Sequence, residues 1–111
     1  MAAATVLAGA ASLAPAQQAA APAGDPRAGR RLAGAQCAAC HGNDGMAVLP
    51  EAPHIAGQKA SYTAAQLQHY RSGERKHELM AVVSQTLSDQ QIADLAAWYE
   101  AIQVEATVPG R

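Results

Sequence analysis

Apolar and small residues recur at helical spacing in three stretches of the chain, the first of which follows Asp25. Asp25 and Pro26 are typical of a helix start, because the carboxylate accepts from free amide groups and proline needs no amide hydrogen there. The pattern that follows predicts a helix as far as Gln36. Ser61 begins a second predicted helix, which ends at Gly73, a residue suited to the left-handed position after a last turn.

The strongest helical pattern follows Ser88. This residue and Gln91 match a capping box, in which each side chain accepts from a backbone amide of the helix start. Leu87 and Ile92 stand at the positions of a hydrophobic staple. The predicted buried stripe of this third helix consists of Ile92, Leu95, Ala96, Tyr99 and Ile102. Three main helices with short helical turns between them, and few strand-like runs, predict an all-α fold.

The first two helices are separated by a long connection, residues 43–59. It contains Gly45, Pro50, Pro53 and Gly57 and lacks helical periodicity, which predicts a loop. Loops of this length are uncommon in a small domain and usually surround something. A second long connection joins the second and third helices.

Gly29 lies inside the first predicted helix. Glycine there costs about 1 kcal/mol relative to alanine, so its presence favours the close approach of another backbone segment. A tolerated surface glycine fits the spacing as well.

The amino-terminal region resembles an export signal. Residues 2–13 form a weakly apolar run, and Ala14-Pro15-Ala16 fits a signal-peptidase site after Ala16. The first positive charge is Arg27, so the basic start of such a signal is missing, and a flexible leader or fusion remnant is the alternative. We therefore expect a signal segment at 1–16, a flexible linker at 17–24 and one domain at 25–111, with a periplasmic location.

Composition changes the picture of the core. Hydrophobic residues make up 50% of the 111 residues, but 29 of them are alanine and there is no phenylalanine. Small domains with so few large apolar side chains usually need a staple such as a metal or a disulfide. A net charge of -1 disfavours binding to nucleic acid, and no apolar run is long enough for a stable membrane span. We therefore expect a bound group to supply apolar mass.

The two cysteines point to the identity of that group. Cys37 and Cys40 are followed directly by His41, which is the spacing that attaches haem in c-type cytochromes. Two thiols three residues apart can add to the vinyl groups on one edge of a haem, and the next imidazole reaches the iron. A thioredoxin-like redox pair, a zinc site and a plain disulfide are the alternatives.

A second iron ligand has to come from elsewhere in the chain. Met80 is favoured, because it lies between the second and third helices in a segment that can close over the opposite face of the ring. His77, three residues earlier, is the runner-up. The other candidates weighed are Met46, His54 and His69.

These features resemble a class I c-type cytochrome, of the small bacterial mono-haem kind that is also repeated in di-haem cytochromes. The resemblance rests on Gly29, the Cys37–Gly42 motif, residues 53–58, Ser72–Arg75, Met80 and the segment 95–99. It implies the cytochrome c fold around one covalent haem c, with the first and last helices crossing at Gly29. It also implies that the Pro53 carbonyl accepts from His41 and that Arg75 approaches a haem propionate.

The function implied is outer-sphere electron transfer between redox proteins, with His41 and Met80 both bound to iron and with no enzyme activity of its own. A dehydrogenase as donor and a terminal oxidase or another cytochrome as acceptor are the expected partners. One alternative is an electron-accepting subunit of a larger periplasmic dehydrogenase. The other is an open-site haem enzyme or gas binder in which Met80 is not bound.

Overall fold

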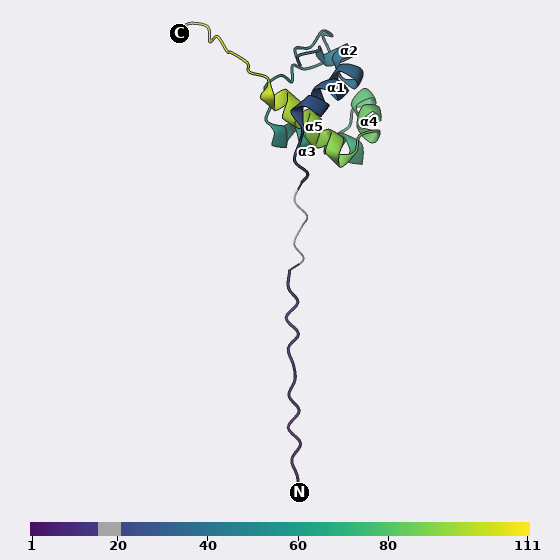
Figure 1. Cartoon of the computed structure of the whole chain (residues 1–111), viewed down its shortest axis with the longest axis vertical. Coiled ribbons are helices and arrows are strands. Elements are labelled where there is room, and N and C mark those ends of the chain that lie inside the picture. Colours follow the sequence, from purple (N-terminus) through teal and green to yellow (C-terminus); the bar gives the residue numbers. More distant parts are fainter. Residues whose placement is uncertain (16–20) are drawn as a thin grey trace.

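The computed structural model describes residues 1–15 and 21–111, and within those ranges it contains five α-helices and no strand. The helices are α1 (Pro26–Gln36), α2 (Ala38–His41), α3 (Ala60–Ser72), α4 (Glu78–Gln85) and α5 (Asp89–Ala101), gathered into one body (Figure 1). The predicted all-α class is confirmed. Residues 1–15 form neither helix nor strand, and the predicted cleavage site after Ala16, with the start of the predicted linker, lies outside the described residues.

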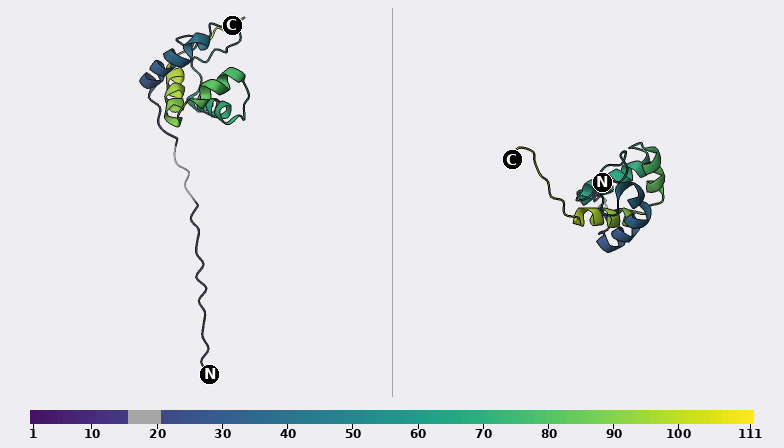
Figure 2. Two further views of the ribbon diagram at one scale, coloured as in Figure 1. Left: turned by 90° about the vertical axis from the view of Figure 1, so that its right-hand side faces the viewer. Right: turned by 90° about the horizontal axis from the view of Figure 1, so that it is seen from above.

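α1 and α5 pack against each other and form the centre of the fold (Figure 2). Gly29 lies at their contact, where a Cβ atom would overlap the carbonyl of Asp94 and press on the Cβ of Trp98. The close approach predicted at Gly29 is therefore confirmed. Asp94 is buried beside it, and its carboxylate accepts from the backbone amide of Asp25 at 2.8 Å, which ties the start of α1 to α5.

The hydrophobic core is small and lies between α1, α3 and α5. Its buried members are Ala33, Leu87, Ile92, Leu95 and Tyr99, with Leu32, Cys37, Ile55, Ala64, Leu67, Trp98 and Ile102 packed against them. The predicted stripe of the last helix faces this core, with Ile102 only partly buried at its end.

The predicted helix ends hold at most positions. The capping box of α5 is complete, since the amide of Gln91 donates to Ser88 Oγ at 3.1 Å and the amide of Ser88 donates to Gln91 Oε1 at 2.9 Å. Gly73 ends α3 in the left-handed conformation. The expected Ser61 cap is wrong, because Ser61 lies inside α3, whose first residue is Ala60 and whose cap position is Lys59. There the amide of Ala60 donates to the Glu100 carboxylate of α5 at 2.6 Å, a tertiary contact that replaces a local cap.

The connection between the second and third predicted helices contains a helix of its own, α4. Its cap is His77, whose Nδ1 accepts from the amide of Met80 at 3.3 Å, so an imidazole replaces the usual hydroxyl or carboxylate. Met80 therefore lies in the first turn of a helix that packs against α3 rather than in an irregular loop.

The long loop after α2 is fixed at several points. The carbonyl of Gly45, whose φ is 77°, accepts from the amides of Ile55 at 2.8 Å and Ala56 at 3.1 Å. The amide of Gly57 donates to the Tyr99 carbonyl of α5 at 2.8 Å. These bonds bring the two ends of the loop together and hold them against the core.

The chain also contacts α5 just before α1 begins. The Ala23 carbonyl accepts from Gln90 Nε2 at 2.8 Å, and a Cβ on Gly24 would overlap the Ala93 carbonyl. The last residues of the segment expected to be a flexible linker thus lie against the helical body.

Candidate haem site

The motif of two cysteines and a histidine lies where α1 passes into α2. Cys37 is both the C-cap of α1 and the N-cap of α2. His41 is the last residue of α2 and is buried. His41 Nδ1 lies 2.9 Å from the Pro53 carbonyl oxygen. Because a carbonyl can only accept, this contact selects the tautomer with hydrogen on Nδ1 and leaves Nε2 free to bind a metal.

A cavity of about 640 Å³ adjoins this histidine. Such a volume is within the range of small-molecule and cofactor sites in proteins. α2, the long loop, α3 and α4 supply its walls, which bring His41 and Met80 to one space although 38 residues separate them in the chain. The lining residues are Cys40, His41, Leu49, Glu51, Ala52, Pro53, His54, Ile55, Gln58, Tyr62, Thr63, Gln66, Leu67, Tyr70, Arg75, His77, Leu79 and Met80.

Two of the other candidates for a second ligand, His54 and His77, line the same cavity, whereas His69 does not. The three remaining histidines each have a hydrogen-bond or ion-pair partner. His54 Nδ1 accepts from the amide of Ala47 at 2.8 Å, and His69 Nε2 lies 3.3 Å from the Glu74 carboxylate. His77 is engaged as the cap of α4. Met46 is 43% exposed and is not part of the cavity wall.

Both cysteine thiols are free and half-buried. Cys40 lines the cavity, whereas Cys37 packs against the core beside Tyr99. Burial raises the pKa of the Cys37 thiol, and the neighbouring Tyr99 hydroxyl partly offsets that rise. Burial also raises the pKa of Tyr99, and the charge of Cys37 adds to the effect.

Arg75 belongs to the cavity wall as well. Its guanidinium carbon lies 4.7 Å from the centre of the Tyr70 ring, and Nη1 donates to Gln66 Oε1 at 2.8 Å. These contacts from α3 orient a positive charge at the cavity, where an anionic group of a ligand would meet it.

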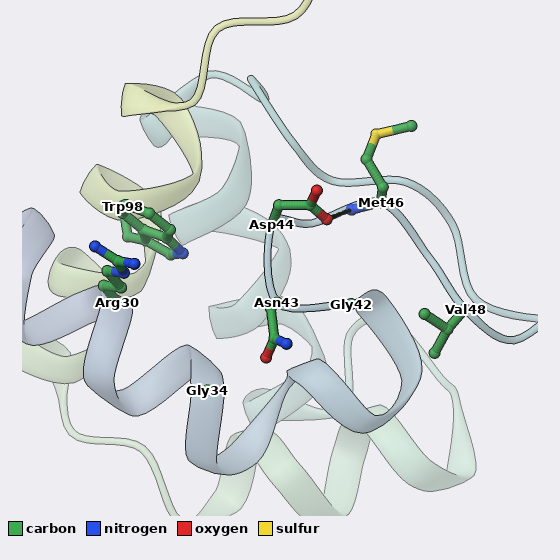
Figure 3. A pocket seen from close by; sticks show the side chains of 8 residues that line it. All are labelled: Arg30, Gly34, Gly42, Asn43, Asp44, Met46, Val48 and Trp98. Atoms are coloured by element: carbon green, nitrogen blue, oxygen red, sulfur yellow. Dashed lines mark hydrogen bonds between the residues drawn. The ribbon is translucent and has the colours of Figure 1, made fainter.

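A second hollow, of about 580 Å³, lies between α1, α5 and the loop after α2 (Figure 3). In it the Arg30 guanidinium carbon lies 5.4 Å from the ring centre of Trp98, and Asp44 accepts from the amide of Met46 at 3.1 Å. Neither His41 nor Met80 lines this hollow, and of the other ligand candidates only Met46 does, so the larger cavity is the candidate haem site.

The donor set of the larger cavity fits a covalent haem. Imidazole and thioether are both ligands of haem iron in cytochromes c, the free Cys40 lines the cavity with His41, and the free Cys37 caps the same short helix that His41 ends. Within residues 1–15 and 21–111, histidine, cysteine and acidic side chains form no cluster of three or more that would hold a bare metal ion. Fold and site together define a c-type cytochrome.

Comparison with known proteins gives the particular family. Residues 24–98 match the family described as "Cytochrome C oxidase, cbb3-type, subunit III". Cytochrome c-554(548) of Halomonas halodenitrificans is 45% identical over 80 residues, which are 69% of this chain and 95% of that protein. The chain belongs to the class I c-type cytochromes, as a mono-haem domain related to cytochromes c-554 and c4.

Two further relatives are much longer than this chain. The crystal structure of reduced recombinant cytochrome c4 from Pseudomonas stutzeri has a TM-score of 0.67 and 36% identity, covering 73% of this chain and 47% of that one. A "Thiosulfate dehydrogenase electron acceptor" of Stutzerimonas stutzeri is 39% identical over 58% of this chain and 31% of its own. From these relationships, the chain is an electron carrier with one covalent haem c attached through the motif at 37–41.

Proposed function

We propose that the chain is a periplasmic carrier in which His41 and Met80 would both bind the haem iron. Support comes chiefly from the cavity, which has His41 on α2 and Met80 on α4 among its walls. Haem iron held by a histidine and a methionine shuttles one electron between its ferric and ferrous forms, and the soft thioether favours the reduced form. With both positions filled, no site is open for a substrate.

The surrounding residues have supporting roles in this proposal. The Pro53 carbonyl oxygen accepts from His41 Nδ1 at an N···O distance of 2.9 Å, which orients the ring and increases the basicity of Nε2. Arg75, held by Tyr70 and Gln66, offers its charge to a haem propionate. Cys37 and Cys40 provide the thioether sulfurs.

We further propose that its donor is a dehydrogenase and that a terminal oxidase or another cytochrome accepts the electron. The relative named as a thiosulfate dehydrogenase electron acceptor supports the first half of this proposal. Export is supported by the pattern of residues 1–16, with 17–24 joining that segment to a domain at 25–111. In the described ranges, every helix is too short or too polar to cross a membrane.

The ligand assignment is tested by Met80→Ala in protein matured with its haem. We expect this variant to lose the weak near-infrared absorption of a methionine bound to ferric iron. Met46→Ala is the matched control, because Met46 is exposed and lies outside the cavity wall, and it should keep the band. Survival of the band in Met80→Ala, or rapid carbon monoxide binding by the unmodified reduced protein, would refute the proposal.

A further inference from the structure

The helix that carries Met80 is attached to the rest of the molecule mainly through α3. In the part of the chain that the structure describes, α4 has extensive helix contacts with α3, and Val82, which does not line the cavity, is 65% exposed. α1 and α5, which form the centre of the fold, do not enclose it (Figures 1 and 2). The position of Met80 therefore depends on what holds α4 to α3.

Among the described residues, Arg71 is the residue of α3 whose hydrogen bonds reach the far end of α4 and the turn after it. The side-chain amide of Gln85, the last residue of α4, donates to the Arg71 carbonyl at 2.6 Å. Arg71 Nη1 donates to the Leu87 carbonyl at 3.0 Å, and Nη2 donates to the Asp89 carboxylate at 2.6 Å. One residue of α3 thus contacts the end of α4, the turn after it and the start of α5.

The geometry of these bonds requires an arginine. A guanidinium presents donors in a rigid plane, so two acceptors on successive parts of a turn are held at a fixed separation. The Asp89 side chain is largely exposed, and such an ion pair adds little to global stability. The bond to the Leu87 carbonyl is partly buried and fixes the turn itself, so its main effect is on where α4 lies.

We propose that Arg71 is a positioning residue that keeps α4, and with it Met80, against the haem cavity. The inference rests on the proposed ligation by Met80. Without the guanidinium, the turn between α4 and α5 loses its two side-chain bonds to α3 and is held there by Leu87 in the core and by the bond of Gln85 to the Arg71 main chain, while the α1–α5 pair stays packed. Met80 then leaves the iron more often without unfolding of the domain.

Imidazole binding to the ferric holoprotein measures this opening directly. Imidazole occupies the iron only when Met80 has left, so its apparent affinity rises with the fraction of open molecules. We expect Arg71→Met, which keeps the apolar stem, to bind imidazole about tenfold more tightly. Arg71→Lys keeps a positive charge but not the paired donors, so its affinity for imidazole should lie between those of the unmodified protein and Arg71→Met. Hydrogen exchange at the α4 amides 81–85 should accelerate in parallel.

Arg31→Met is the matched control, since Arg31 is exposed on α1 and its side chain forms no ion pair or hydrogen bond within the described chain. Its imidazole affinity should equal that of the unmodified protein. A change of less than twofold in Arg71→Met, or a lowered resistance to guanidinium with unchanged imidazole affinity, overturns the positioning role. If the unmodified protein lacks the near-infrared methionine band, the ligation proposal fails first and this one with it.

Discussion

Tyr99 has a hydroxyl that is buried and poorly satisfied. The residue is 2% exposed, and within the described residues its oxygen makes no well-formed hydrogen bond, although the Cys37 thiol is near enough for the two groups to affect each other's pKa. Leaving a buried hydroxyl without a good partner costs about 1–3 kcal/mol. Its ring, in contrast, packs in the centre of the core.

Tyr99→Phe removes this hydroxyl and keeps the ring. We expect the free energy of unfolding of the holoprotein to rise by about 1 kcal/mol, measured by guanidinium denaturation. A loss of stability in Tyr99→Phe would mean that the hydroxyl has a strong partner in the holoprotein, with the Cys37 sulfur the first candidate.

Single residues also show how far sequence alone reaches. Cys37, Cys40 and His41 were predictable because the spacing that attaches a haem is local in the chain. The contact between His41 and Pro53 was expected only through family resemblance, since it depends on how a loop folds back. The role of Arg71 was not predicted from the sequence. Its three partners lie 14 to 18 residues away, and no short pattern marks such a set.

At the level of the helices, the local capping signals of Asp25 and Ser88 were reliable, whereas the signal of Ser61 was not. α1 and α5 begin where Asp25 and Ser88 predicted, because those side chains satisfy amides of their own helix. α3 begins at a contact with Glu100 of α5, forty residues away, which a local pattern cannot contain. α4 was missed because an imidazole caps it and because packing on α3 stabilises so short a helix.

Substitution by alanine is expected to have opposite effects on stability at two glycines of α1, Gly29 and Gly34. Gly29→Ala would force a methyl group into the Asp94 carbonyl, and we expect it to lower the free energy of unfolding by about 3 kcal/mol. Gly34→Ala places the same group on an exposed position with nothing within 4 Å, and should raise it by about 0.5–1 kcal/mol. Thermal denaturation of the two variant holoproteins measures both changes in stability. Equal effects would show that α1 and α5 are not in close contact at Gly29.

The molecule as a whole has two interior regions, a buried core and a cavity. The buried core consists of a few side chains around α5, and the cavity of about 640 Å³ adjoins Leu67, which also packs against that core. Much of the inner surface of α3 and of the long loop therefore faces the cavity rather than other protein atoms. The sequence indicated this through its shortage of large apolar residues, but not which walls would be affected.

We expect the chain without haem to be largely unfolded or molten, because these walls would then lack their packing partner. The measurement is thermal denaturation followed by circular dichroism of the chain produced where haem attachment does not occur. The holoprotein, matured in a periplasm that attaches haem, is the control and should melt cooperatively. A sharp, cooperative transition in the haem-free chain would contradict the expectation.

The Gly45 carbonyl, which accepts from both Ile55 and Ala56, has a consequence for sequence change. These two bonds close the backbone around residues 46–54. The Cys40 carbonyl also accepts from the amides of Val48 and Leu49. Small insertions next to Pro50, which is exposed and does not line the cavity, would therefore lengthen the loop while the bonds at its base stay in place. The length of the chain at this point can thus vary with little effect on the packing of the loop ends against the core.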